Sequence, residues 1–265
     1  MNSFPHSTNN SELNVIKTFG SQALDANLST RVGRPPDSLD KEIALWADIH
    51  TKLRLGSGLR VLDVGCGCGH IARNWEKMVR EEGVVAVLVD IAPVIDQCAL
   101  DLDLKSLPHG SLSLRAGFFP KALDEERLAI KYDRILCYSV LHYCEDPALL
   151  IHQAYELLAP GGRLLIGDIP NLSRKGRFLS TKYGHAFNAL YKNVPASSLP
   201  RFINHQSYTE DYMKSTPKPY LNDEFLESQI HKYREAGADA FILEQPQQLV
   251  YSLTREDLLI VKPHE

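Results

Sequence analysis

Short apolar runs alternate with amphipathic stretches through the middle of this chain. Four runs predict buried strands, because they are short, mostly apolar and rich in β-branched or aromatic residues: 61–64, 84–89, 132–139 and 163–168. A weaker strand is expected over 112–115. Apolar residues at helical spacing predict helices after the first and fourth runs, at Ile71, Trp75, Met78 and Val79 and at Leu150, Ala154, Leu157 and Leu158.

Strands that alternate with helices at this spacing predict an α/β fold with a doubly wound parallel sheet. Ligands of such sheets bind at the carboxyl ends of the strands. Near the end of the chain, Leu226, Ile230 and Tyr233 predict one more helix, which stops at Gly237. Two further strands are expected over 241–243 and 258–261.

The region before the first strand is less regular. Residues 1–12 are mostly polar, and we expect them to be loosely attached. A helix is expected around 43–53, where apolar residues recur at helical spacing after the turn signal at 35–38. It could help to close over a ligand or serve only as a structural extension.

A glycine-rich loop follows the first strand. Glycines at 65, 67 and 69 allow positive φ and let a ligand lie against bare main chain. The spacing is G-x-G-x-G, whereas a dinucleotide fingerprint is G-x-G-x-x-G. Asp63 stands two residues before the first glycine. A carboxylate there would repel a pyrophosphate and attract an ammonium or a sulfonium.

The Asp63–Gly69 run resembles motif I of class I S-adenosylmethionine-dependent methyltransferases. Two later segments resemble the same family at the expected distances: Ser139–His142, after the fourth strand, and Leu157–Ile166, at the turn into the fifth. The resemblance covers about 58–170 and the ending. It implies a mostly parallel, seven-stranded Rossmann-like sheet, closed by an antiparallel hairpin at one edge.

The resemblance also implies the cofactor contacts. Asp90, at the end of the second strand, is placed to accept hydrogen bonds from both ribose hydroxyls. Many relatives carry an acid near position 117 that contacts the adenine amino group. This chain has none, so main chain near Gly117 and the Phe118 ring are expected to hold the adenine, or the phenylalanines there belong to the core. The expected cofactor-binding residues are Asp63, Gly65, Cys66, Gly67, Gly69, Asp90, Ile91, Gly117, Phe118 and Ser139.

About 50 residues that a minimal fold does not need follow the fifth strand, and we interpret 171–222 as a cap over the methyl acceptor. Residues 171–220 carry eight Lys or Arg against two acids, whereas the whole chain has a net charge of −4. They also hold eight of the 22 aromatic residues. The aromatics could be the cap's own core and the cations a solvated face. Alternatively, the cations indicate an anionic acceptor.

Expected acceptor-binding residues are Tyr143, Arg174, Lys175, Arg177 and Tyr183. A hydroxyl acceptor needs at most one general base, because the sulfonium is already an activated leaving group. His142, after the fourth strand, is the first candidate and His185 the second. Either could equally be a packing histidine.

The expected function is therefore methyl transfer from S-adenosylmethionine, giving S-adenosylhomocysteine, to a hydroxyl or amine of a small polar acceptor. That acceptor is expected to be anionic or phosphorylated, such as a nucleotide-linked sugar or a biosynthetic intermediate. Two alternatives remain open. A non-catalytic cofactor-binding module or partner subunit would bind S-adenosylmethionine without turnover, and an NAD-dependent oxidoreductase would bind NAD instead.

Composition bears on the location of the protein and on its partners. The start of the chain lacks a signal-peptide pattern and the longest apolar run is too short to cross a bilayer, so we expect a cytoplasmic protein with no membrane partner. Five scattered cysteines without zinc spacing predict free thiols and no metal. Nucleic acid is disfavoured because the rest of the chain is acidic. A homodimer is left open.

We expect a single domain over 1–265. Its parts are an N-terminal helical extension (1–57), the cofactor-binding core (58–170), the cap (171–222), and a C-terminal helix with the closing strands (223–265).

Overall fold

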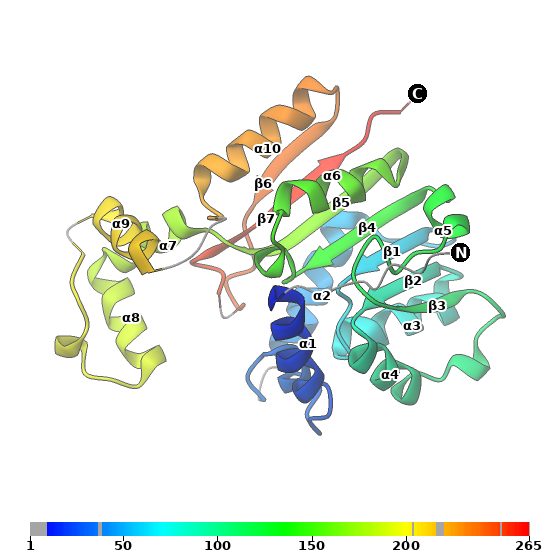
Figure 1. Cartoon of the computed structure of the whole chain (residues 1–265), viewed down its shortest axis with the longest axis horizontal. Coiled ribbons are helices and arrows are strands. Elements are labelled where there is room, and N and C mark those ends of the chain that lie inside the picture. The colour runs from blue at the N-terminus through cyan, green and yellow to red at the C-terminus, as the bar shows by residue number, and fades with distance from the viewer. Residues whose placement is uncertain (1–9, 37–38, 203, 216–219, 250, 265) are drawn as a thin grey trace.

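A seven-stranded sheet forms the centre of the molecule (Figure 1). The computed structural model describes residues 10–36, 39–202, 204–215, 220–249 and 251–264. The strand order is β3-β2-β1-β4-β5-β7-β6, and β7 runs antiparallel to both of its neighbours. The strands are β1 (Arg60–Val64), β2 (Val85–Asp90), β3 (Leu112–Ala116), β4 (Tyr132–Tyr138), β5 (Leu158–Pro170), β6 (Asp239–Leu243) and β7 (Arg255–Val261). The predicted doubly wound, mostly parallel fold with an antiparallel edge is confirmed.

The central strands are apolar on both sides because helices cover both faces of the sheet. Val61 packs in one hydrophobic cluster and its neighbour Leu62 in the other. Helices α2 (Leu39–Leu53), α3 (His70–Glu82) and α4 (Ala92–Asp101) contribute to the first cluster. Helices α6 (Pro147–Glu156) and α10 (Asp223–Glu235) contribute to the second. The predicted helices correspond to α2, α3, α6 and α10.

Three short elements connect the larger strands and helices. They are the 3₁₀ turns η2 (Leu104–Ser106) and η3 (Leu141–Tyr143) and the one-turn helix α5 (Glu125–Ala129). Strand β5 begins at Leu158, earlier than the expected start at Arg163. The Pro-Gly-Gly turn is included because its backbone pairs with the end of the chain, where Lys262 N–H donates to Gly162 O.

Two N-terminal elements were not predicted from the apolar pattern: the helix α1 (Asn10–Gln22) and the 3₁₀ turn η1 (Thr30–Val32). Residues 1–9 of the expected loose segment lie outside the described part, as do residues 37–38 of the turn before α2. From Asn10 onward the chain is helical instead. Val15, Ile16 and Phe19 pack against the first hydrophobic cluster, and this burial stabilises a helix of modest propensity.

The segment between β5 and α10 folds into three helices and a turn: α7 (Leu172–Leu179), α8 (Lys182–Lys192), η4 (Ala196–Ser198) and α9 (His205–Ser215). The helices gather at one end of the molecule, away from most of the sheet (Figure 1). Leu172, Leu179 and Tyr208 form a small separate core, against which Phe178, Phe202, Tyr212 and Tyr220 pack. Most of the cap's aromatics therefore stabilise the cap itself. In the described residues, no helix is long and apolar enough to cross a membrane.

Candidate functional site

A cavity of about 670 Å³ opens at the carboxyl ends of the strands. The ends of β1, β2, β4 and β5 form its floor through Val64, Val89, Tyr138 and Asp168. Residues of α1, η1 and α2 line it as well, together with Gln245, Leu249 and Tyr251 before β7 and Arg255 at its start. The cavity thus joins segments from both ends of the chain over the predicted ligand-binding edge.

The glycine loop lies on this cavity. Gly65 and Gly67 have φ values of +73° and +60°, in the left-handed region that favours glycine. A Cβ on Gly65 would lie 2.3 Å from Val140 Cγ2, and one on Gly67 would lie 2.7 Å from Val32 Cγ1. Packing therefore demands these glycines in addition to any ligand.

Asp90 fastens the loop to the end of β2. Its two carboxylate oxygens accept hydrogen bonds from the backbone N–H of Gly67 (2.8 Å) and of Ile91 (2.7 Å). Burial raises the pKa of Asp90 to about 6, although these two hydrogen bonds act in the opposite direction. Each oxygen has a second lone pair, so the carboxylate can also accept from ligand hydroxyls.

Asp63, at the end of β1, is held by the helix that follows the glycine loop. It is 1% exposed, and one carboxylate oxygen accepts a 2.7 Å hydrogen bond from the Trp75 indole N–H. Burial raises the pKa of Asp63 to about 7, the Trp75 bond opposes the rise, and the negative charge of Asp90 adds to it. The side chain borders the cavity but is tied to α3.

The residues expected at the adenine end follow the ends of β2 and β3. Ile91, Gly117 and Phe118 line the cavity with Cys66 and Gly69. Gly117 N–H donates to the backbone oxygen of Asp90 (2.8 Å), which holds the two strand ends together. Cys66 is buried, and its contact with the Cys98 thiol together with burial keeps the pKa of Cys66 well above its ordinary value. The cysteines are free, and all but the half-buried Cys144 are buried.

Beyond β4 the cavity is lined by a polar network. Ser139 has a φ of +63° and its hydroxyl donates to Asp168 Oδ2 at 2.7 Å. Arg255 also donates to that oxygen, at 2.6 Å, and its guanidinium carbon lies 4.4 Å from the centre of the Tyr251 ring. Asp168 and Arg255 were not predicted. Asp168 could have been found from the sequence, because it is an acid near the end of an apolar strand, as Asp90 is.

His142 and Tyr143 lie in the same part of the cavity. His142 Nδ1 is buried with no hydrogen-bond partner among the described residues. Burial, with a smaller effect of the Arg255 charge, lowers the pKa of His142 to about 3. The imidazole is therefore neutral at physiological pH. The Tyr143 ring meets Phe19 of α1 edge to face at 5.1 Å, so α1 covers this part.

The N-terminal segment supplies lining residues that sequence reasoning missed. Arg34 donates to Glu42 Oε2 at 2.6 Å, and both residues border the cavity. Glu42 lies three and seven residues before the buried Leu45 and Ile49, so it occupies the apolar side of α2. An acid on the apolar side of a helix could therefore have identified Glu42 from the sequence.

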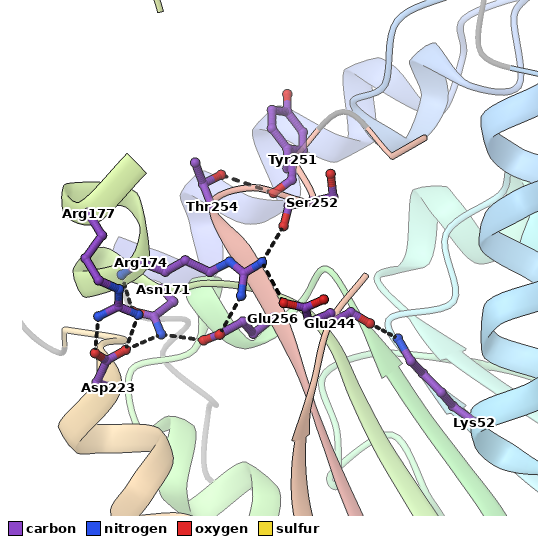
Figure 2. A network of polar contacts seen from close by, with 10 residues as sticks. All are labelled: Lys52, Asn171, Arg174, Arg177, Asp223, Glu244, Tyr251, Ser252, Thr254 and Glu256. Carbon is purple, nitrogen blue, oxygen red and sulfur yellow. Dashed lines mark hydrogen bonds and ion pairs between the residues drawn. The ribbon is translucent and has the colours of Figure 1, made fainter. Parts of the chain in front are cut away.

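The cations expected to bind the acceptor, Arg174, Lys175 and Arg177, lie outside this lining, which differs from the expectation. Figure 2 shows Arg174 and Arg177 beside carboxylates instead. Arg174 donates to Glu256 at 2.9 Å and lies 3.8 Å from Glu244. Arg177 pairs with Asp223. As the sequence predicts, these arginines lie just after the end of β5. Their charges, however, are neutralised by acids that come much later in the chain.

The remaining predicted cap residues also fall outside the cavity lining. Lys175 Nζ lies 5.9 Å from the centre of the Tyr212 ring. Tyr183 is 67% exposed and packs at its edge against Phe178. His185 Nε2 is 3.4 Å from Leu199 O, within the cap. The structure therefore brings together the predicted cofactor residues, His142 and Tyr143, but not the predicted cap residues.

A positively charged, elongated cofactor such as S-adenosylmethionine fits this lining. Seven acids line the cavity against five Lys or Arg, and two of those acids, Asp63 and Asp90, lie next to the glycine loop. Four residues of the lining each have one buried side-chain atom without a hydrogen-bond partner among the described residues: Gln22 Oε1, Glu42 Oε1, His142 Nδ1 and Gln245 Oε1. Four further atoms of this kind, in Arg115, Arg134, Gln229 and Tyr233, belong to residues outside the lining, so such atoms alone do not mark the ligand site. The described residues form no cluster of three or more His, Cys, Asp or Glu placed to bind a metal.

Comparisons with known proteins agree with this geometry. A family model described as a methyltransferase domain matches residues 39–213. The ubiquinone biosynthesis O-methyltransferase of Xylella fastidiosa strain 9a5c is 34% identical over 114 residues, which are 43% of each chain. That of Xanthomonas euvesicatoria strain 85-10 is 29% identical over 125 residues, 46% of this chain and 47% of the relative. The match thus spans less than half the length of these relatives.

Solved structures share the fold at low sequence identity. The plantazolicin methyltransferase BpumL, in complex with a triazolic desmethyl analogue and S-adenosylhomocysteine, has a TM-score of 0.53 at 12% identity. The similarity covers 97% of this chain and 92% of that one. A chain from the complex between the Haloferax volcanii Trm112 methyltransferase activator and a methyltransferase has a TM-score of 0.54 at 12% identity. The similarity covers 95% of this chain and 97% of that one.

Proposed function

The chain belongs to the family of methyltransferase domains, and from this premise we propose that it transfers a methyl group from S-adenosylmethionine to a hydroxyl, or less favourably an amine, of a small polar acceptor. The observation that carries the proposal is the single cavity that joins the glycine loop and Asp90 to His142 and Arg255. A donor bound at the first pair and an acceptor at the second would share one enclosed space.

The residues of this chain have distinct tasks in that reaction. Asp90 would accept hydrogen bonds from the ribose hydroxyls, and the backbone of the loop at Gly65 and Gly67 would hold the rest of the cofactor. S-adenosylmethionine, when bound, supplies a methyl group already activated by its sulfonium. The Phe19 and Tyr143 rings, which meet edge to face at the cavity, would limit the entry of water and so favour transfer to the acceptor over hydrolysis.

His142 is the residue that we propose accepts the acceptor's proton, at Nδ1. It is neutral at physiological pH, as a proton acceptor must be, and that atom has no partner among the described residues. The low pKa makes His142 a weak base, so an acidic hydroxyl is a better substrate than an ordinary alcohol. The O-methyltransferase names of the relatives also favour oxygen as the acceptor atom.

We propose further that the acceptor carries an anionic group. Arg255 supports this, because it lines the cavity near His142 and its guanidinium can donate more hydrogen bonds than the two it gives to Asp168. The ion-paired Arg174 and Arg177 offer no such support.

Calorimetric titration tests the assignment. The protein should bind S-adenosylhomocysteine and not NAD. Incubation with S-adenosylmethionine and a panel of phenols, carboxylates and phosphorylated metabolites should then release S-adenosylhomocysteine with at least one acceptor. Binding of NAD alone would identify an oxidoreductase instead. Cofactor binding without turnover on any member of a broad panel would favour a non-catalytic module.

A further inference from the structure

Lys175 differs from the two arginines near it in α7, because no acid neutralises it. Arg174 and Arg177 have carboxylate partners. The Lys175 ammonium lies 5.9 Å from the centre of the Tyr212 ring, and it makes no hydrogen bond or ion pair with the described residues. The side chain is half-buried, but its nitrogen is not among the fully buried atoms that lack a partner. A ligand can therefore reach this ammonium.

Two further cations approach Lys175 from other elements. Lys192 ends α8 and is exposed, with no acid partner among the described residues. Arg255 begins β7 and lines the cavity. Burial lowers the pKa of Lys175, and the positive charges of Lys192 and Arg255 lower it further, so both cations lie close to it. Three cations from the cap and the sheet thus gather beside the cavity.

Two tyrosines join the elements that carry these cations. The hydroxyl of Tyr191, in α8, lies 3.1 Å from the hydroxyl of Tyr251. The Arg255 guanidinium carbon lies 4.4 Å from the centre of the Tyr251 ring. Since Lys192 directly follows Tyr191, this contact brings the end of α8 to the start of β7. One hydroxyl of the pair donates to the other, so one hydroxyl hydrogen is left for a ligand.

Of the three cations, Arg255 is the one with a counter-charge among the described residues. Its Nη1 donates to Asp168 Oδ2 at 2.6 Å and to the backbone oxygen of Asp168 at 3.2 Å. Glu256, the next residue of β7, points to the opposite side of the strand and pairs with Arg174 (Figure 2). The two lysines therefore leave two positive charges unmatched. Like charges that gather in a partly buried place repel one another, and a bound dianion would offset this repulsion.

This group of cations lies next to the proposed proton acceptor. Arg255 and His142 both line the cavity, and the Arg255 charge contributes to the low pKa of His142. Lys175 and Lys192 belong to the cap and lie outside the lining. An acceptor whose reacting hydroxyl lies at His142 can therefore extend past Arg255 toward the cap.

We propose that Lys175, Lys192 and Arg255 bind a phosphate monoester carried by the methyl acceptor. Guanidinium and ammonium groups both donate to phosphate oxygens, and a dianion matches the two lysine charges, whereas a carboxylate would match one. This inference rests on the proposed function and narrows its acceptor from an anionic to a phosphorylated molecule. It also gives the cap a role in choosing the acceptor, because two of the three cations are cap residues.

Phenyl phosphate and phenyl sulfate test the inference, because they share a ring and a tetrahedral anion but differ in charge. At about pH 8 the phosphate ester carries two negative charges, since its second pKa is about 6, whereas the sulfate ester carries one. The full chain, saturated with S-adenosylhomocysteine, is titrated by calorimetry. The wild type should bind phenyl phosphate more tightly than phenyl sulfate.

The two cap lysines should contribute unequally to that affinity. Lys175→Gln should weaken phenyl phosphate binding by about tenfold and reduce the preference for phosphate over sulfate, because a half-buried charged donor is lost. Lys192→Gln should weaken it by about two- to fivefold, because Lys192 is exposed.

Lys182→Gln is the matched control, because Lys182 begins the same helix, is exposed and has no acid partner among the described residues. It should leave the affinity for phenyl phosphate unchanged. Lys175→Arg keeps the charge and should keep most of the affinity, which separates a lost charge from a disturbed cap. Every variant should bind S-adenosylhomocysteine as the wild type does.

Five results would overturn the inference and leave the proposed function intact. They are a wild type that binds no phenyl phosphate, a wild type that binds phenyl sulfate at least as tightly, unchanged affinity in Lys175→Gln, an equal loss in Lys175→Arg, and an equal loss in Lys182→Gln. Inorganic phosphate that binds as tightly as phenyl phosphate would assign the site to a free anion instead of the acceptor. Failure of the wild type to bind S-adenosylhomocysteine would refute the proposed function itself.

Discussion

The cofactor cavity and the cap use their polar groups in opposite ways. In the cavity, buried atoms such as Glu42 Oε1 and His142 Nδ1 have no partner among the described residues. In the cap, the arginines that looked available in the sequence are matched: Arg174 by Glu256 and Arg177 by Asp223. The comparison teaches that a local excess of charge in the sequence does not by itself mark a binding site, because residues far away in the chain can balance it.

The largest effect is expected at His142, on the acceptor side of the cavity. His142→Ala should lower turnover on the best acceptor by roughly 10²–10⁴-fold and leave S-adenosylhomocysteine affinity unchanged, because the proton loses its acceptor. His185→Ala is the matched control, since His185 lies in the cap, outside the cavity lining. Because the pKa of His142 is about 3, its protonation should cause no loss of turnover between pH 5 and 9. If His142→Ala keeps the turnover of the wild type, His142 has only a packing role.

Asp90 should give the next largest effect, on cofactor affinity. Asp90→Asn should weaken S-adenosylhomocysteine binding by about ten- to a hundredfold, because ribose hydroxyls lose a charged acceptor. The ionised carboxylate is the better acceptor, so wild-type affinity should fall as the pH drops through about 6, the pKa of Asp90 in the free protein. Asp90→Asn should remove that component of the pH dependence. The exposed Asp103→Asn is the control. Equal affinity of Asp90→Asn and wild type at pH 8 would contradict the assignment.

Asp63 tests the cost of a charge in the cavity region. Its folded-state pKa of about 7 lies above the ordinary aspartate pKa of 3.8, so its contribution to stability is largest below pH 4 and is lost as the pH rises through 7. Asn at this position still accepts from Trp75 but carries no charge. In thermal unfolding of the ligand-free protein, Asp63→Asn should therefore gain stability relative to wild type between pH 5 and pH 8. A difference that does not change with pH would show that Asp63 is not strained by burial.

The cap arginines should show the opposite sign and the smallest effects. Arg174→Gln leaves Glu256, whose side chain is 11% exposed, without its cation and should cost about 1–3 kcal/mol of unfolding free energy. The Arg177–Asp223 pair is more exposed, so Arg177→Gln should cost about 1 kcal/mol or less. Denaturant unfolding compares the two variants. Cofactor affinity should remain unchanged in both variants. A raised KM for the acceptor with unchanged stability would instead show that these arginines bind the acceptor.

Much of the cofactor side of the site could be predicted from sequence because its determinants are local. Asp63, the glycines at 65 and 67, and Asp90 stand within or just after strands whose apolar runs are unmistakable, and parallel strands place their carboxyl ends at one edge. The backbone conformation that a G-x-G-x-G loop needs is a property of its own residues.

Only the tertiary structure decided which polar groups are left without partners. Arg174 and Glu256 are 82 residues apart, and Glu42 and Gln245 come from opposite ends of the chain to line one cavity. Local spacing records periodicity and turn chemistry, but ion pairing and burial depend on distances that exist only after the sheet has brought β5, β7 and α2 together. For that reason the sequence determined the fold and the glycine loop, while the packing of the folded chain decided that Arg174 and Arg177 are paired and that Arg34 and Glu42 line the cavity.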